Sequence, residues 1–217
     1  MERPEVAVRV TGRFITLEGG EGAGKSTQLK ALAQRLRGTG LEVVETREPG
    51  GSAGAEAIRS LLLTGAEDRW NARAEALLFA AARADHLEKT ILPGLRRGAW
   101  VLSDRFLDSS RAYQSGASGL ADADILALHR IGSEGLLPDR TLVLTLDEAE
   151  AAARAAKRDR GAADRIGARD TAFHRRVADA FRAYACQEPG RIRLIDASGQ
   201  PDEVTARLWD ALSDLMP

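Results

Sequence analysis

Residues 19–26 read Gly19-Gly20-Glu21-Gly22-Ala23-Gly24-Lys25-Ser26 and fill the pattern G-x-x-x-x-G-K-[ST]. The apolar run Phe-Ile-Thr-Leu at 14–17 precedes them and predicts a buried strand, and residues 27–36 predict a helix. Glycines in such a turn let several backbone N–H groups converge on one anion at the helix N-terminus. The segment therefore predicts a nucleoside triphosphate site in an α/β fold.

Two side chains of this phosphate loop carry the expected chemistry. Lys25 is expected to reach the terminal phosphates, and the hydroxyl of Ser26 is expected to hold Mg²⁺. Thr27 opens the helix and completes the expected ATP-binding stretch. An ordinary glycine-rich turn would need neither the lysine nor the hydroxyl, so we interpret the segment as functional.

The composition fits one cytoplasmic α/β domain over residues 1–217. Lys plus Arg number 31 against 32 for Asp plus Glu, so we expect neither nucleic acid nor membrane as a partner. The single cysteine, Cys186, excludes an intramolecular disulfide and fits a reducing compartment. Residues 1–12 lack the apolar core of a signal peptide and are expected to be an N-terminal extension.

Apolar runs of strand length recur along the chain, separated by alanine-rich stretches with helical periodicity. This alternation predicts a five-stranded, mainly parallel sheet with helices on both faces, which binds its ligand at the carboxyl ends of the strands. The five runs are residues 14–17, 41–46, 100–102, 141–146 and 192–195.

The loops after the second and third runs predict a second anion site. Arg47 follows one strand and Arg105 another, and arginine binds phosphate through planar, bidentate contacts. A nucleotide hydrolase needs one phosphate site, whereas a kinase with a phosphorylated acceptor needs two. Asp104 stands where an acid would orient Mg²⁺, although it is also placed to pair with an arginine or cap a helix.

An arginine-rich segment at about 154–170 contains Gly161 and Gly167 as possible hinges. Most charge runs are solvated helix faces. Beside a phosphate loop, we interpret this one as a mobile flap (LID) that closes over phosphates.

At this point the chain resembles the bacterial thymidylate kinase (dTMP kinase) family of P-loop nucleoside monophosphate kinases. The resemblance runs in family order from residue 14 onward, and its most specific parts are the Thr-Arg-Glu-Pro-Gly-Gly and Asp-Arg-Phe segments. The matching segments are 14–28, 46–51, 77–83, 104–114, 138–139 and 164–166.

The resemblance implies a site for dTMP. Arg47 and Arg105 would grip its phosphate, Phe79 would stack on thymine, and Arg83 would hydrogen-bond the base edge. By periodicity alone Phe79 would instead be a core residue. Further matched positions are Glu48 beside Arg47, Ser109 and Gln114 near the base, and Tyr113 against the sugar C2′, where a ring disfavours a ribose.

Family members differ in whether the transition-state arginine comes from the phosphate loop or from the flap. Residues 20–23 contain no basic side chain, so the resemblance implies a flap-dependent enzyme with Arg158 and Arg160 as the catalytic candidates. Arg154 and Arg165 are the next candidates for the same role. Two departures from the family pattern are Gly167, where members often carry glutamate, and Phe106, where many carry tyrosine or histidine.

The expected activity is therefore Mg²⁺-dependent transfer of the ATP γ-phosphoryl group to dTMP, catalysed by Lys25, Asp104, Arg105 and flap arginines. The family also implies a homodimer. Alternatives are a kinase for another deoxynucleotide or a deoxynucleoside, and a P-loop switch protein. The absence of an Asn-Lys-x-Asp guanine motif argues against the switch protein.

Overall fold

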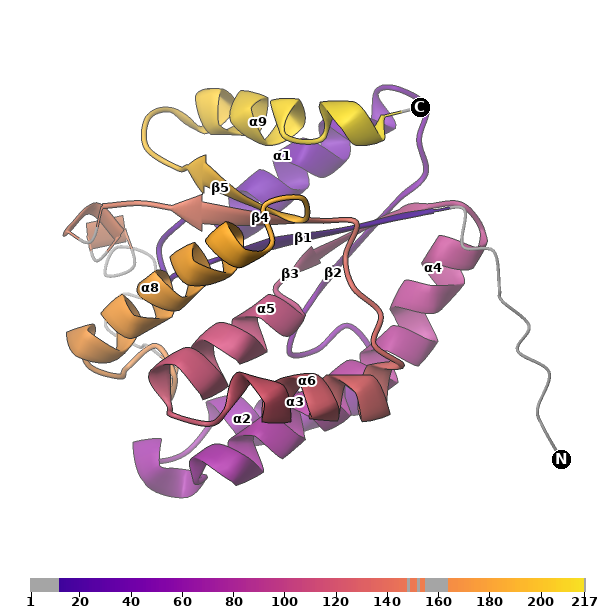
Figure 1. Ribbon diagram of the computed structural model, residues 1–217. Coiled ribbons are helices and arrows are strands. Elements are labelled where there is room, and N and C mark those ends of the chain that lie inside the picture. The colour runs from indigo at the N-terminus through magenta and orange to yellow at the C-terminus, as the bar shows by residue number, and fades with distance from the viewer. Residues whose placement is uncertain (1–11, 148, 152, 155–163, 217) are drawn as a thin grey trace, which may run out of the picture.

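The computed structural model describes residues 12–147, 149–151, 153–154 and 164–216 (Figure 1). A five-stranded sheet with the order β2-β3-β1-β4-β5 lies at its centre. Every strand pair in the described part of the chain is parallel, which confirms the predicted α/β sheet. The strands are β1 (Arg13–Gly19), β2 (Val43–Arg47), β3 (Trp100–Asp104), β4 (Arg140–Thr145) and β5 (Ile192–Asp196).

Helices cover both faces of the sheet. In Figure 1, α1 and α9 lie on one face, and α3, α5, α6 and α8 lie on the other. The helices are α1 (Lys25–Arg37), α2 (Ala53–Leu63), α3 (Ala72–His86), α4 (Leu92–Arg96), α5 (Leu107–Ser110), α6 (Asp122–Ser133), α8 (Thr171–Gln187) and α9 (Pro201–Asp210). Short 3₁₀ or π segments are η1 (Glu67–Arg69), η2 (Leu87–Ile91), η3 (Arg111–Ala117) and η4 (Ser213–Leu215).

Alternating strand residues enter two separate cores. Ile15 and Leu17 pack with the residues of α1 and α9, whereas Phe14 packs with residues of α3 and α4 on the opposite face. Likewise Leu102 and Val101 point to opposite sides of β3. Because both faces are covered, the strands carry continuous apolar runs instead of alternating polar residues.

The parallel register brings the three predicted functional loops to one edge of the sheet. Asp104 at the end of β3 is paired with Leu17 of β1 on one side and with Arg47 of β2 on the other. The loops after these strands therefore start side by side. This is the edge at which parallel sheets bind their ligands.

Two glycines set the path of the phosphate loop. A Cβ on Gly19, which has φ of 130°, would lie 2.4 Å from the carbonyl oxygen of Leu144 in β4. Gly24, with φ of 88°, occupies the N-cap of α1 in the left-handed region that glycine favours. Glycine is therefore required at the strand end by close packing and at the helix start by backbone conformation.

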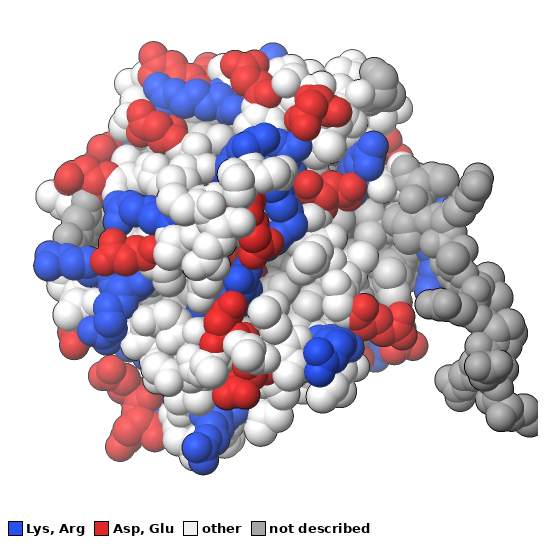
Figure 2. Space-filling view, in the orientation of Figure 1, with Lys and Arg blue, Asp and Glu red and all other residues white. Residues whose placement is uncertain are grey.

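Positive and negative side chains are interspersed over the face shown in Figure 2. This pattern agrees with the balanced composition. Within the described ranges, no helix is long and apolar enough to cross a membrane.

We expect replacement of Leu102 by alanine to destabilise the protein by about 2–5 kcal/mol, because it leaves a cavity in a fully buried strand position. Leu194→Ala is a matched control, since this leucine also lies in a strand but is 44% exposed. Urea unfolding of both variants and the parent measures the two losses. Equal losses would contradict the assignment of β3 to the core.

Candidate active site

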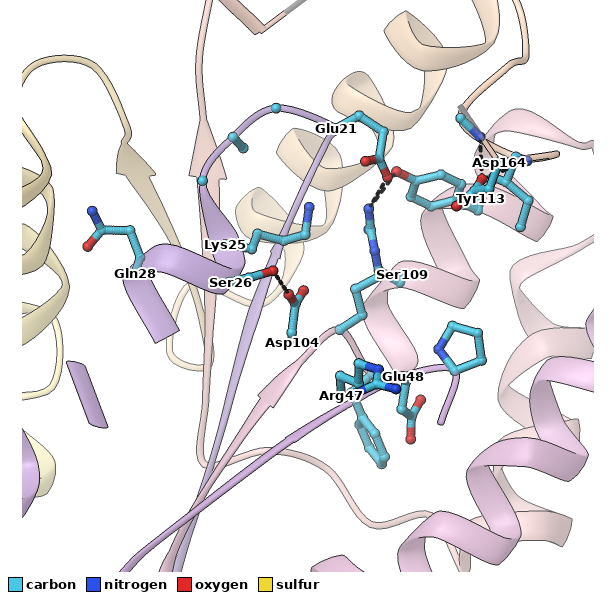
Figure 3. A pocket seen from close by; sticks show the side chains of 18 of the residues that line it. Glu21, Lys25, Ser26, Gln28, Arg47, Glu48, Asp104, Ser109, Tyr113 and Asp164 are labelled. Atoms are coloured by element: carbon cyan, nitrogen blue, oxygen red, sulfur yellow. Dashed lines mark hydrogen bonds and ion pairs between the residues drawn. The ribbon is translucent and has the colours of Figure 1, made fainter. Parts of the chain in front are cut away.

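A cavity of about 730 Å³ opens at the carboxyl ends of the strands. The phosphate loop, the Arg47 loop, α3 and the segment after β3 all contribute to its wall (Figure 3). Most predicted site residues therefore share one cavity. Those that line it are Glu21, Gly22, Ala23, Gly24, Lys25, Ser26, Thr27, Arg47, Glu48, Phe79, Arg83, Asp104, Arg105, Ser109, Tyr113 and Gln114.

Lys25 lies folded over the phosphate loop. Its Nζ donates hydrogen bonds to the carbonyl oxygens of Gly19, at 3.2 Å, and Gly20, at 2.8 Å, two loop residues that are not part of the cavity wall. Burial, together with the positive charge of Arg105, lowers the pKa of Lys25 to about 8. A bound triphosphate would offset both effects, so this ammonium suits an anionic ligand.

Ser26 and Asp104 form a pair of oxygen donors beside the lysine. The Ser26 Oγ donates to Asp104 Oδ2 at 2.7 Å, as drawn in Figure 3. The described residues contain no cluster of three or more His, Cys, Asp or Glu able to hold a metal alone. Mg²⁺ with a nucleotide needs few protein ligands, because phosphate oxygens and water complete its octahedron. A hydroxyl and a carboxylate therefore fit this ion.

The backbone of Arg105 has an unusual conformation. Its φ of 71° lies in the left-handed region, which costs a non-glycine residue about 1–3 kcal/mol. Two hydrogen bonds hold it: its N–H donates to the Leu17 carbonyl at 3.0 Å, and its own carbonyl accepts from Ser103 Oγ at 2.7 Å. The chain leaves β3 through this left-handed residue.

The Arg105 guanidinium lies between the phosphate loop and the helix that follows β3. It donates to the Gly19 carbonyl at 3.1 Å, Glu21 Oε1 at 2.8 Å, Ser109 Oγ at 3.0 Å and the Tyr113 hydroxyl at 3.2 Å. The phosphate loop and the helical segment of α5 and η3 therefore both contact the Arg105 guanidinium. In this arrangement Ser109 and Tyr113 contact Arg105 directly.

Arg47 reaches the cavity, but an acid of α2 holds its side chain. Arg47 Nη2 donates to Glu56 Oε1 at 2.7 Å, and the same oxygen accepts from the backbone N–H of Gly51 at 3.0 Å. Arg59 also lines the cavity and donates to the Pro49 carbonyl at 2.6 Å. Arg47 and Arg59 therefore both line this part of the cavity, where the sequence predicted only Arg47.

Phe79 and Arg83 lie one helical turn apart on α3 and both line the cavity. Phe79 also packs partly buried against the core cluster that contains Tyr113, which agrees with its periodicity, whereas stacking on a base stays a prediction. Arg83 is buried and donates to Glu48 Oε2 at 2.8 Å and to the Phe106 carbonyl at 3.1 Å. Glu48 thus lines the cavity and also holds Arg83 in place.

Gln114 is 1% exposed and lines the same cavity. Its Nε2 donates to Glu75 Oε1 at 3.1 Å, whereas its buried Oε1 has no hydrogen-bond partner among the described residues. A buried unpaired acceptor costs about 1–3 kcal/mol. A ligand with an N–H donor at this point would remove that cost.

Glu18 is a fully buried acid behind Arg105. Its carboxylate accepts from the Phe106 backbone N–H at 2.8 Å and from Ser109 Oγ. Burial, followed by the charge of Asp108, raises the pKa of Glu18 to about 8. Ser109 therefore links this acid to the arginine of the site.

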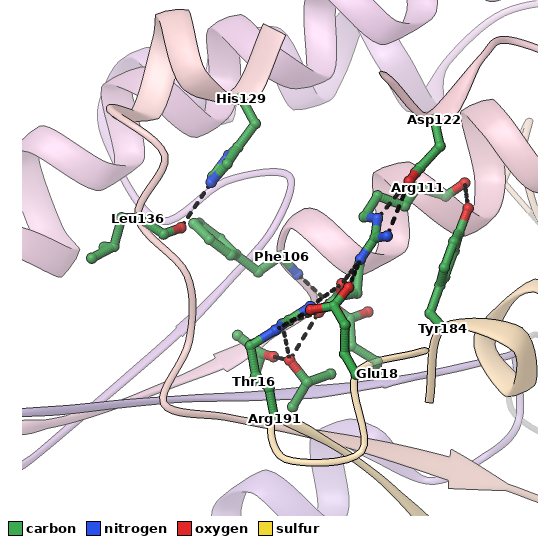
Figure 4. Close-up of polar contacts among 12 residues, drawn as sticks. Thr16, Glu18, Phe106, Arg111, Asp122, His129, Leu136, Tyr184 and Arg191 are labelled. Atoms are coloured by element: carbon green, nitrogen blue, oxygen red, sulfur yellow. Dashed lines mark hydrogen bonds and ion pairs between the residues drawn. The ribbon is translucent and has the colours of Figure 1, made fainter. Parts of the chain in front are cut away.

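Behind Glu18, a buried ionic cluster anchors the helix that carries Ser109 and Gln114 (Figure 4). Arg191 donates to both oxygens of Asp108, at 2.7 and 2.9 Å, and Arg111 donates to both oxygens of Asp122, at 3.0 Å each. Burial opposes the charge of Asp108, but its hydrogen bonds to Arg191 hold its pKa below the ordinary value. The cluster fixes α5 and η3 against the start of β5.

The two leading flap candidates, Arg158 and Arg160, lie outside the described residues. Arg154 lines the cavity and donates to the Ala197 carbonyl at 3.3 Å. The loop after β5 is part of the same wall through Ala197 and Gly199.

Arg165 has a different role from the one considered in the sequence. It is 4% exposed and does not line the cavity. Its donors go to the Leu62 carbonyl at 2.8 Å, the Glu67 carbonyl at 3.0 Å and the carboxylate of Glu75. A guanidinium committed in this way supports the fold and is not available to phosphates.

The structure explains one departure from the family pattern and locates the other. Phe106 is fully buried, and its ring packs edge-on against Phe14 at 4.8 Å and His129 at 5.5 Å. The ring belongs to the apolar cluster of this face of the sheet, where phenylalanine packs without a polar tip. Gly167 lines the cavity, next to Ile166.

Sequence reasoning missed Glu18, Arg59 and Glu75. Glu18 had a signal, since a charged residue inside an apolar strand is rare unless it has partners. Arg59 and Glu75 had none, because a charged residue on a helix is normally solvent-exposed. Their roles depend on contacts between distant segments.

Comparison with known proteins gives a consistent result. A family model described as thymidylate kinase matches residues 17–208. A thymidylate kinase of Rhizorhabdus wittichii is 67% identical over 206 residues, covering 95% of this chain and 99% of that protein. One of Bradyrhizobium sp. strain BTAi1 is 52% identical over 205 residues, covering 94% of this chain and 90% of that protein.

A solved structure gives the same picture. The crystal structure of thymidylate kinase from Ehrlichia chaffeensis matches with a TM-score of 0.73 and 32% identity, covering 93% of this chain and 98% of that one. With the family model covering most of the chain and relatives this similar over nearly their full length, the chain belongs to the thymidylate kinase family.

Proposed function

We propose that this chain transfers the γ-phosphoryl group of ATP to dTMP, giving dTDP and ADP. One observation carries the proposal. A single cavity joins a phosphate loop to Arg105, and the far side of that cavity carries an aromatic ring, an arginine and an amide suited to a base. Donor and acceptor phosphates would meet at the guanidinium.

The reaction requires that the protein position the two substrates and offset the negative charge on the transferred group. A phosphate oxygen of dTMP is the nucleophile and is ionised at neutral pH, so no general base is needed. It attacks the γ-phosphorus while the bond to the ADP oxygen breaks. Lys25 and Arg105 offset the negative charge on the moving group, and an arginine of the flap completes this.

Ser26 and Asp104 would hold Mg²⁺. The ion neutralises charge on the β- and γ-phosphates when it is bound. The side chains of this pair keep two hard oxygen atoms at the phosphate loop, 2.7 Å apart.

The residues of the dTMP site bind three parts of that molecule, namely its phosphate, its base and its sugar. Arg47, Arg59 and Arg105 bind the dTMP phosphate, and Phe79 stacks on thymine. Arg83 donates to the base edge, held there by Glu48. Ser109 supports Arg105, Gln114 contacts the base, and Tyr113 lies against C2′ of the sugar.

The chain forms one domain over residues 1–217, with residues 1–12 as an extension and about 154–170 as the flap. We place it in the cytoplasm, where ATP and dTMP are available. We also propose a homodimer through α3 and α6, which pack against each other. Leu77 on α3 is 56% exposed and Ile131 on α6 is 79% exposed, which supports an apolar contact surface.

An assay of ADP release with ATP, Mg²⁺ and a panel of nucleoside monophosphates tests the activity. We expect turnover with dTMP to exceed that with the other monophosphates, and Arg105→Ala to lower kcat/KM for dTMP by about 100- to 1,000-fold. Glu67→Ala, an exposed control, should leave it within about twofold. Slow ATP hydrolysis at a rate that does not depend on which monophosphate is present would instead indicate a switch protein.

The flap arginines are tested by single substitutions. Because they would act on transition-state charge, Arg158→Ala or Arg160→Ala should lower kcat by about 100-fold or more while KM for dTMP changes little. Arg182→Ala, an exposed arginine of α8, is the control. Steady-state kinetics in which neither flap variant loses more than this control would contradict a flap-derived arginine.

ATP affinity should depend on pH through Lys25. Its pKa of about 8 in the free protein means that the ammonium loses its proton above that pH, whereas bound phosphates favour the charged form. The Kd for ATP should therefore be steady below about pH 7 and rise above pH 8 by up to about tenfold per unit. Calorimetric titration measures this slope.

Glu18 ionises in the same pH range, so a variant is needed to isolate the lysine. Lys25→Met removes the titrating ammonium and keeps Glu18. It should bind ATP more weakly, without the alkaline slope of the parent. The same slope in both proteins would assign the effect to another group.

A further inference from the structure

Glu75 of α3 connects three side chains from two distant segments. It is 1% exposed. Its Oε2 accepts from Arg165 and, at 2.8 Å, from Arg169, both near the C-terminal end of the flap segment. Its Oε1 accepts from Gln114 Nε2 at 3.1 Å. Glu75 is not part of the cavity wall, but Gln114 is.

The chemistry of these partners fixes the direction of each hydrogen bond. Arginine has donors only, so Oε2 of Glu75 accepts from both guanidinium groups. Both oxygens of the Glu75 carboxylate are acceptors. The amide of Gln114 can therefore meet Glu75 only through its NH₂ group. The opposite orientation would set two oxygen acceptors against each other inside the protein.

This constraint leaves the oxygen end of the Gln114 amide available for another partner. With Nε2 committed to Glu75, the remaining polar atom of Gln114 is Oε1, which is buried and has no hydrogen-bond partner among the described residues. Arg83, which also lines the cavity, lies on the same helix as Glu75. The cavity is thus offered an acceptor from Gln114 and a donor from Arg83.

We propose that Glu75 is a specificity-determining positioning residue, which locks the Gln114 amide so that its carbonyl oxygen selects a base with an N–H at N3. The proposal rests on the function proposed above. Thymine carries a hydrogen on N3 and an acceptor oxygen on C4, which match Gln114 and Arg83. Cytosine carries a lone pair on N3 and an amino group on C4, and both are mismatched.

A glutamine in place of Glu75 would remove the lock. Its amide can present either an oxygen or an NH₂ group to Gln114, so both orientations of the Gln114 amide become possible. Once turned, Gln114 would offer a donor to cytosine N3. Rejection of a base that leaves buried polar groups unpaired is the strongest kind of discrimination that a binding site achieves.

The test compares kcat/KM for dTMP and dCMP in the parent and in Glu75→Gln. We expect the dTMP/dCMP ratio to fall by about tenfold, the range that one hydrogen bond controls, while KM for ATP stays unchanged. Glu88→Gln, an exposed glutamate of the next segment, should keep the parent ratio. If Glu75→Gln does not fold, Glu75→Asp keeps the charge but withdraws the carboxylate from Gln114, and the same fall is expected.

A double-mutant cycle shows whether Glu75 acts through Gln114. In a Gln114→Leu background, Glu75→Gln should leave the ratio where Gln114→Leu alone sets it. Equal losses for dTMP and dCMP in Glu75→Gln, or a further fall in the ratio in the Gln114→Leu background, would overturn the proposal. A parent protein that does not phosphorylate dTMP would overturn the proposed function itself, which is a distinguishable result.

Discussion

The parallel alignment of β1, β2 and β3 is the constraint on which the site depends. Because Leu17, Asp104 and Arg47 are neighbours in register, the three loops that follow leave the sheet at one edge. The turn at Arg105 then directs a guanidinium back toward the phosphate loop. A shift of one residue between β1 and β3 would point these side chains to the opposite face.

Buried charge is the second organising feature, and several of the buried charged groups near the cavity are held in ion pairs. Asp108 meets Arg191 and Arg111, and Glu75 meets Arg165. Such pairs contribute little net stability, because desolvation offsets most of their attraction. Instead, each pair fixes the orientation of a helix or a side chain that faces the ligand. The amide of Gln114 and the helix of Ser109 are held in this way.

Motif and periodicity were good predictors where the signal is local. The phosphate loop, the five strands and the helices on both faces were all confirmed, because each depends on a spacing within a short segment. The amphipathic pattern of residues 201–215 predicts a C-terminal helix over that whole stretch. The helix ends at Asp210 and is followed by the 3₁₀ turn η4. Element ends depend on capping and packing, which periodicity does not contain.

The sequence by itself determined the sheet, the phosphate loop, the family and the chemical types of the site residues, since these follow from spacing along the chain. Only the tertiary structure decided how those residues are used. It paired Arg47 with Glu56, buried Arg165 against Glu75, and left Gln114 with one committed and one unpaired atom. Hydrogen bonds between segments far apart in sequence have no periodic signature, so their partners are defined only when the chain has folded.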